Sequence, residues 1–128
     1  MNIFKTISMV EKKEIIFNIP EKACILTLNG KLLQDKDSAI NYICQSFHIE
    51  RKVTNWAGLR DVLSDSYWIK NDITYVFFTN QQWIFNSNSD FRQILLSILF
   101  DTVEWWDGDV EKYVVGGEKK SFNVYLVD

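Results

Sequence analysis

Three short apolar runs, separated by longer segments with helical periodicity, constrain the fold of this 128-residue chain most strongly. The runs cover residues 23–28, 73–78 and 122–127, and they are rich in the β-branched and aromatic residues typical of buried strands. Strands that alternate with helices pair in parallel, because each crossover needs a helix-length connection. We therefore expect a small three-layer α/β domain with a mostly parallel three-stranded sheet packed with helices. The first run is apolar enough to be covered on both faces.

Apolar residues at helical spacing predict three helices between the runs. One ends near Phe47, the second covers 56–64, and the longest covers 91–106. The first places Ala39, Ile40, Ile43, Cys44 and Phe47 on one face, and the second places Leu59, Val62 and Leu63 on one face. A polar residue that can accept the free N–H groups precedes each helix: Asp35 or Asp37, Thr54 or Asn55, and Asn88, Ser89 or Asp90.

Residues 1–22 form an N-terminal extension to a domain that covers 23–128. Within the extension, residues 14–19 predict a short strand that ends at Pro20, because proline cannot donate to a sheet ladder. We expect this β extension, a strand or a hairpin, to pack on the domain as a separate layer. Residues 107–120 are expected to form a charged loop.

The composition indicates an ordinary globular protein, with 47% hydrophobic and 24% charged residues. No apolar run approaches the roughly 18 residues that span a bilayer. The N-terminus lacks the pattern of a secretory signal, so we expect a cytoplasmic protein with Cys24 and Cys44 as reduced core thiols. Two Cys and one His without ligand-like spacing predict no metal, and nothing in the sequence predicts a cofactor.

The net charge of −3 is unevenly distributed along the chain. Residues 1–60 carry nine Lys or Arg against six Asp or Glu, whereas residues 61–128 carry five against eleven. An acidic second half argues against direct nucleic-acid binding, which needs a basic surface, and permits a basic protein partner. Five Trp exceed what a core of this size needs, which suggests that some lie at a binding surface.

Candidate catalytic motifs are weak. Gly116 and Gly117 lack the following Lys and Ser or Thr of a phosphate loop and precede a strand. Cys44 and His48 have helical spacing suited to a thiol and its base, but a core thiol and a histidine at a helix end are the simpler interpretation. An acidic stretch begins late in the last predicted helix and continues beyond it: Asp101, Glu104, Asp107, Asp109 and Glu111. It allows three interpretations: a solvated helix end, a docking surface for a basic partner, or paired carboxylates for catalysis or a divalent metal.

Three stretches of the sequence resemble the barstar family of ribonuclease inhibitors. Residues 25–32 are similar to the family's first strand and Asn-Gly turn. Residues 55–63 (NWAGLRDVL), followed by Asp65 and Trp68, are similar to its pattern Asn-hydrophobic-Asp-Ala-Leu-x-Asp-Cys-Leu. The closing strand–helix–strand order is also similar, and the resemblance covers the chain from Ile25 onward.

The resemblance implies a cytoplasmic bacterial immunity protein of a toxin–antitoxin pair, without catalytic residues. It would bind a cognate toxin, a basic ribonuclease, and plug its active site with the second predicted helix and an acidic surface. Asp61 matches the family's aspartate that replaces a substrate phosphate, and Asp101 or Glu104 matches an acidic contact late in the last helix. Trp56 is equally compatible with the core and with the interface. The expected partner-binding residues are Asn55, Trp56, Arg60, Asp61, Asp65, Asp101 and Glu104.

Two departures from the family pattern bear on the partner. Ala57 stands where the family has its first helix aspartate, and the preceding loop, 49–54, is basic where the family's is aromatic and rich in glycine. A basic loop facing a basic nuclease would cost like-charge repulsion, so the target need not be the family's usual enzyme. Two rival hypotheses are an interaction module for a non-nuclease partner and a small hydrolase that uses the carboxylates near Asp101. The sequence leaves the oligomeric state open.

Overall fold

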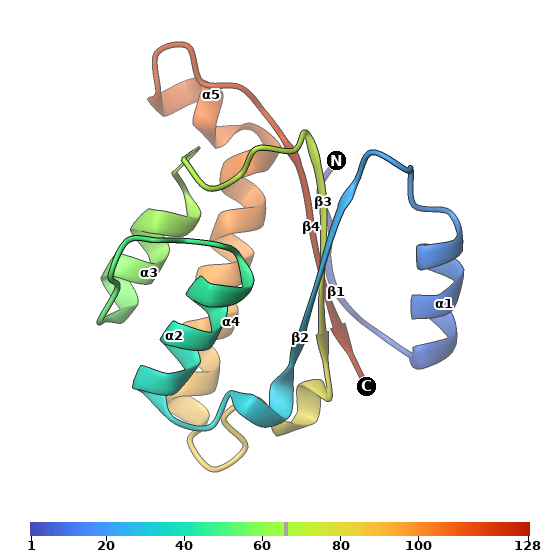
Figure 1. Cartoon of the computed structure of the whole chain (residues 1–128), viewed down its shortest axis with the longest axis vertical. Coiled ribbons are helices and arrows are strands. Elements are labelled where there is room, and N and C mark those ends of the chain that lie inside the picture. Colours follow the sequence, from blue (N-terminus) through green and yellow to red (C-terminus); the bar gives the residue numbers. More distant parts are fainter. Residues whose placement is uncertain (66) are drawn as a thin grey trace.

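A four-stranded parallel sheet forms the middle layer of the molecule, and helices cover both of its faces (Figure 1). The structure is a computed structural model that describes residues 1–65 and 67–128. Its strands are β1 (Phe4–Ile7), β2 (Cys24–Asn29), β3 (Ile73–Thr79) and β4 (Ser121–Val127), in the spatial order β1-β4-β3-β2. The predicted α/β class and parallel pairing are confirmed.

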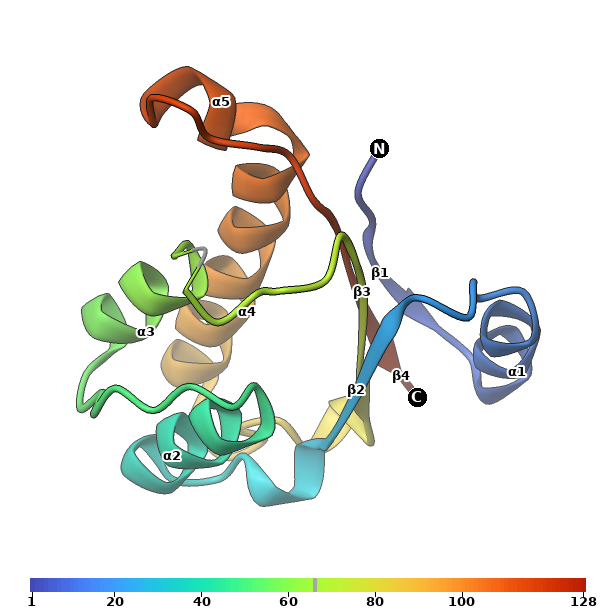
Figure 2. The ribbon, with the colours of Figure 1, turned by 45° about the horizontal axis from the view of Figure 1, so that its top comes forward.

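Helices α2, α3 and α4 lie on one face of the sheet, and α1 lies on the other (Figure 2). Their bounds are α1 Met9–Phe17, α2 Lys36–Ser46, α3 Trp56–Leu63, α4 Ser89–Glu104 and α5 Val110–Tyr113. Short turns of 3-10 helix, η1 (Gly30–Leu32) and η2 (Gln81–Trp83), follow β2 and β3. The side chains of Asp35, Asn55 and Asn88 cap α2, α3 and α4, each within the predicted set.

The main core lies between the sheet and the layer of α2, α3 and α4. The predicted apolar stripes of α2 and α3 are buried there, together with Trp106, Phe78 and Phe122. A smaller core lies under α1, where Ile15 packs against Ile7, Phe77, Tyr125 and Val127. Burying an aliphatic or aromatic side chain contributes about 2 kcal/mol, so the main core provides most of the stability that holds α3 in place.

The N-terminal extension differs from the prediction. Residues 14–17 belong to α1, and the extension's strand is β1, which pairs in parallel with β4 as a fourth strand of the same sheet. The helix forms because Ser8 and Glu11 make a reciprocal capping box at its start. That local signal outweighs the β-branched residues further along. The helix α1, and not a strand, forms the layer on this face.

Two other local expectations are also wrong. Residues 107–113 are helical and not a loop, because α4 continues through a π-helical turn, η3 (Trp105–Asp109), into α5. The strand β2 is not covered on both faces, because it lies at the edge of the sheet and leaves Ile25 45% exposed. At the end of β2, a Cβ on Gly30 would lie 2.8 Å from the Thr79 carbonyl oxygen, so only glycine permits this close approach of η1 to η2.

Candidate functional site

The helix α3 presents Asp61 to solvent. The Asn55 side chain starts the helix by accepting a hydrogen bond from the Gly58 amide at 2.7 Å. Leu59 and the other apolar residues of the stripe anchor the inner face, so Asp61 lies exposed on the outer face. Across residues 1–65 and 67–128, no cationic side chain forms an ion pair with Asp61. Its carboxylate is therefore available to a cation from outside the molecule.

Arg60 and Asp101, two of the predicted binding residues, contact each other. The Arg60 guanidinium on α3 forms an ion pair with the Asp101 carboxylate on α4. Both side chains remain about half exposed, at 43% and 50%. The two charges offset each other, so this part of the surface has little net charge.

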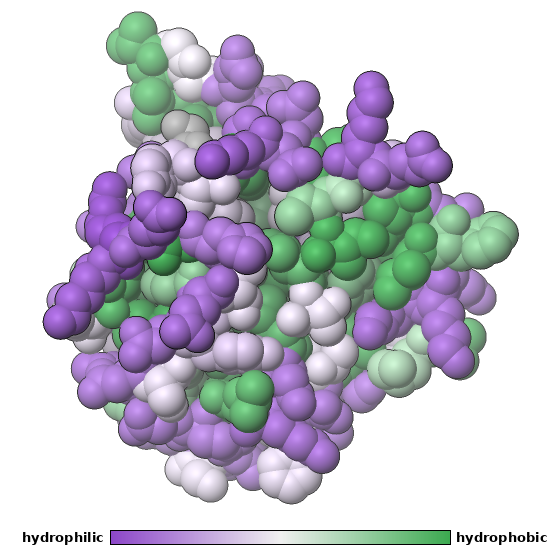
Figure 3. Space-filling model, in the orientation of Figure 1, coloured by the Kyte–Doolittle hydropathy of each residue, from purple (hydrophilic) through white to green (hydrophobic). Residues whose placement is uncertain are grey.

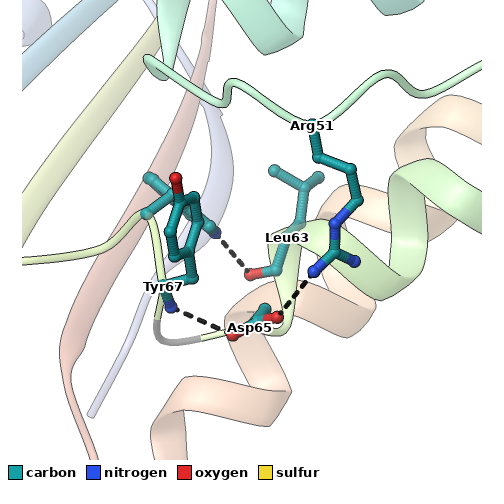
Figure 4. Close-up of polar contacts among 5 residues, drawn as sticks. Arg51, Leu63, Asp65 and Tyr67 are labelled. Carbon is teal, nitrogen blue, oxygen red and sulfur yellow. Dashed lines mark hydrogen bonds and ion pairs between the residues drawn. The ribbon is translucent and has the colours of Figure 1, made fainter.

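Asp65 is engaged by its own chain (Figure 4). Its carboxylate lies 3.5 Å from the Arg51 guanidinium and accepts a hydrogen bond from the Tyr67 amide at 3.0 Å. Arg51 belongs to the basic loop that departs from the family pattern, so one of the loop's two cations is used within the molecule. Nearby, the Trp68 indole N–H donates to the Leu63 carbonyl oxygen at 3.3 Å. These contacts join the end of α3 to the loops on either side.

Trp56 packs against the core. Its ring is half-buried and meets Phe85 and Phe91 edge to face, with centroids 5.9 and 5.7 Å away. This contact fixes the first turn of α3 on the start of α4.

Glu104, the second acidic candidate on α4, is exposed, and no ion pair to it occurs in the described part of the chain.

The carboxylates of the acidic stretch that follows α4 do not cluster at one site. Asp107 accepts a hydrogen bond from the Asn2 amide at 2.8 Å, and Asp109 and Glu111 pair with Lys112 and Lys119. No group of three His, Cys, Asp or Glu side chains suited to a metal ion occurs in residues 1–65 and 67–128. The geometry therefore gives the hydrolase hypothesis no support.

The Cys44–His48 pair is also unsupported as a nucleophile and base. Cys44 is buried, and burial raises the pKa of its thiol, as it does for Cys24. A raised pKa keeps the thiol protonated, which is the opposite of what a nucleophilic cysteine requires. His48 is exposed, with a left-handed backbone (φ 56°) after α2.

A cleft that sequence reasoning missed lies between α3 and the segment after α5. It has a volume of about 560 Å³, with Asp61 and Asp65 on one side and Trp105, Val114 and Val115 among the residues that complete its lining. The available signal was the apolar triplet 113–115 inside a highly charged stretch. Sequence reasoning treated that stretch as a loop and did not bring it next to α3.

The fold and this surface define a small α/β domain that presents exposed charged side chains on the outside of a helical layer, a geometry suited to binding another protein. The family model described as Barstar (barnase inhibitor) matches residues 23–126. The chain therefore belongs to the barstar family, whose members inhibit ribonucleases by binding them. No curated protein and no solved structure matched the chain. Within the described residues, no helix has the length and apolar character needed to cross a membrane.

Proposed function

We propose that this chain is a bacterial immunity protein that binds a cognate ribonuclease toxin in the cytoplasm and inhibits it. In this proposal α3 covers the active site of the enzyme, and the Asp61 carboxylate occupies the position of a substrate phosphate. The supporting observations are the family match over residues 23–126, a range that includes Asp61, and the exposure of the Asp61 side chain, which forms no ion pair within residues 1–65 and 67–128.

The physical basis is complementarity of charge and shape. A ribonuclease site holds phosphate with Arg, Lys and His, and a carboxylate placed there forms charge-assisted hydrogen bonds. The helix that carries Asp61 is fixed by its Asn55 cap and by its buried apolar stripe. Because the backbone is ordered before binding, little conformational entropy is lost on association.

The four acidic residues among the predicted binding residues divide into two groups under this proposal. Asp61 and Glu104 contribute negative charge that no internal cation offsets in the described part of the chain. Asp65 and Asp101 are already paired with Arg51 and Arg60, so a partner's cations must compete for them. Asp61 therefore carries more of the binding energy than either paired carboxylate.

A non-nuclease partner is the second candidate, and Ala57 favours it. The family's first helix aspartate is absent at this position, and the Arg51–Asp65 ion pair further reduces the unbalanced negative charge. Both candidates predict binding through α3. Only the inhibitor abolishes RNA cleavage by its partner.

The test uses a panel of purified basic bacterial ribonucleases, with barnase among them. Binding and RNA cleavage are measured for wild type, Asp61→Asn and the control Glu14→Gln, which removes the same charge from an exposed residue of α1. We expect wild type and Glu14→Gln to bind one enzyme and stop its cleavage, and Asp61→Asn to bind at least a hundredfold more weakly. Lack of inhibition of every enzyme, or full inhibition by Asp61→Asn, would overturn the proposal.

A further inference from the structure

The last residue of α5 and the turn that follows it expose three consecutive apolar residues, and residues 113–117 are hereafter called the turn. Tyr113, Val114 and Val115 are 76%, 44% and 105% exposed. Hydrophobic side chains are visible at the top of the molecule in Figure 3, where this turn extends beyond the end of the sheet. Contiguous exposed apolar groups surrounded by charges are typical of contact surfaces.

Internal contacts hold this turn in one conformation. The Tyr113 ring stacks on Trp105, with centroids 6.3 Å apart and the planes 8° from parallel. The Val114 amide donates to the Val110 carbonyl oxygen at 3.1 Å, and the Gly117 amide donates to the Val114 carbonyl oxygen at 3.0 Å. The turn therefore presents its apolar residues in a fixed position, which lowers the entropic cost of binding.

The turn and α3 form opposite walls of the same cleft. Val114 and Val115 line the cleft together with Asp61 and Asp65, and Glu118 adds a third carboxylate to its lining. The lining also includes one cation, Lys120, whose ammonium lies 3.7 Å from the Asp72 carboxylate. The backbone that returns to the sheet is fixed by the Lys120 amide, which donates to the Trp106 carbonyl oxygen at 3.0 Å. A partner protein that covers Asp61 therefore also contacts the apolar turn.

We infer that residues 113–117 form a second contact element for the same basic ribonuclease, an inference that rests on the proposed function. Cationic groups of the enzyme's active site meet Asp61, and an apolar patch on the rim of that site packs on Val115. The acidic lining of the cleft and the fixed position of the turn next to α3 favour this occupant over an unrelated partner.

This arrangement assigns specificity to the turn. All ribonuclease active sites hold phosphate with similar cationic side chains, so a phosphate mimic such as Asp61 discriminates poorly among them. The rim of the active site differs between enzymes, and an apolar contact there favours the enzyme whose rim matches it. The turn therefore selects the enzyme, whereas Asp61 blocks its chemistry.

The test compares Val115→Asn with Val10→Asn on the ribonuclease panel used for Asp61. Val10 is 67% exposed on α1, on the opposite face of the sheet, so both variants remove the same exposed apolar group without changing the charge. We expect Val115→Asn to raise the Kd about tenfold, mainly through faster dissociation, and Val10→Asn to leave it within twofold. Urea unfolding of both variants should match wild type, because neither side chain is buried.

The outcomes separate the two proposals. If wild type binds and inhibits an enzyme and Val115→Asn binds as tightly as Val10→Asn, the role of the turn is overturned and the inhibitor proposal stands. If wild type binds no ribonuclease, both proposals fail. Sedimentation is measured in parallel, and a concentration-dependent dimer that Val115→Asn abolishes would assign the turn to a second copy of this chain and overturn the inference.

Discussion

Arg60 on α3 and Asp101 on α4 form an ion pair that joins the two helices of the proposed binding surface. The pair holds α3 against α4 on the outer side, while the apolar stripe of α3 holds it on the inner side. Asp61 is the next residue along the helix. The contact therefore neutralises one acidic candidate and positions the exposed carboxylate beside it.

The Arg60–Asp101 pair should contribute only modestly to folding. Because both side chains are about half exposed, water screens their attraction, and such pairs contribute about 0 to 1 kcal/mol. A double-mutant cycle with Arg60→Ala and Asp101→Ala, followed by urea unfolding, measures the coupling directly. The control Glu104→Gln, on the same helix, should change the free energy of unfolding by less than about 0.5 kcal/mol. A coupling well above 1 kcal/mol would contradict this account.

Asn55 should act as a helix cap and not as a direct contact. Its side-chain oxygen already accepts the Gly58 amide, so Asn55→Ala should lower the free energy of unfolding by about 1 kcal/mol. Asn55→Ser retains a neutral acceptor and should restore most of that stability. If Asn55 only caps, Asn55→Ser also binds the ribonuclease within a few-fold of wild type. A stable Asn55→Ser variant with strongly reduced binding would instead place Asn55 in the interface.

Gly30 should tolerate no larger residue. A Cβ at this position would press on backbone oxygens of Thr79 and Asn80, and backbone cannot move aside as a flexible side chain can. Overpacking of this kind costs about 1 to 3 kcal/mol, so Gly30→Ala should show that loss in urea unfolding. Unchanged stability would mean that η1 and η2 can separate without cost.

Local signals in the sequence predicted most of the fold. The stripes of α2 and α3 and the caps of α2, α3 and α4 appear where the sequence places them, because periodicity and capping both act within a few residues. The prediction failed at residues 14–19, where β-branched residues were given more weight than the Ser8–Glu11 capping box. It also failed for β2, because the residues of a strand do not reveal whether it lies at the centre or the edge of a sheet.

The candidate site was only partly predictable, for a related reason. Asp61 and its exposure follow from the motif and the helical period. The pairing of Arg60 with Asp101 depends on how α3 packs against α4, and the cleft beside Asp61 depends on the path of the chain after α5. Both are contacts between segments distant in sequence, which periodicity within one segment does not specify.

Stability should decline in alkaline solution because three weak acids are buried or partly buried: Cys44 and Tyr125 are buried, and Cys24 is partly buried. Burial raises the pKa of the Cys24 and Cys44 thiols above the ordinary value of 9.0, and burial together with the neighbouring Tyr75 raises the pKa of Tyr125 above 10.0. The unfolded chain then loses these protons at lower pH than the folded chain. The stabilising contribution is therefore fully present below about pH 9 and is lost as the pH rises through the folded-state values.

Urea unfolding at intervals from pH 7 to pH 11 measures this decline. We expect a constant contribution from these groups up to about pH 9 and a falling free energy of unfolding above it, since the unfolded state binds fewer protons there. Tyr125→Phe removes one of the three groups, so its profile should fall less steeply than that of wild type above pH 10. A wild-type free energy of unfolding that stays constant to pH 11 would contradict the assignment of this decline to the three groups. Equal slopes for wild type and Tyr125→Phe above pH 10 would contradict the contribution of Tyr125.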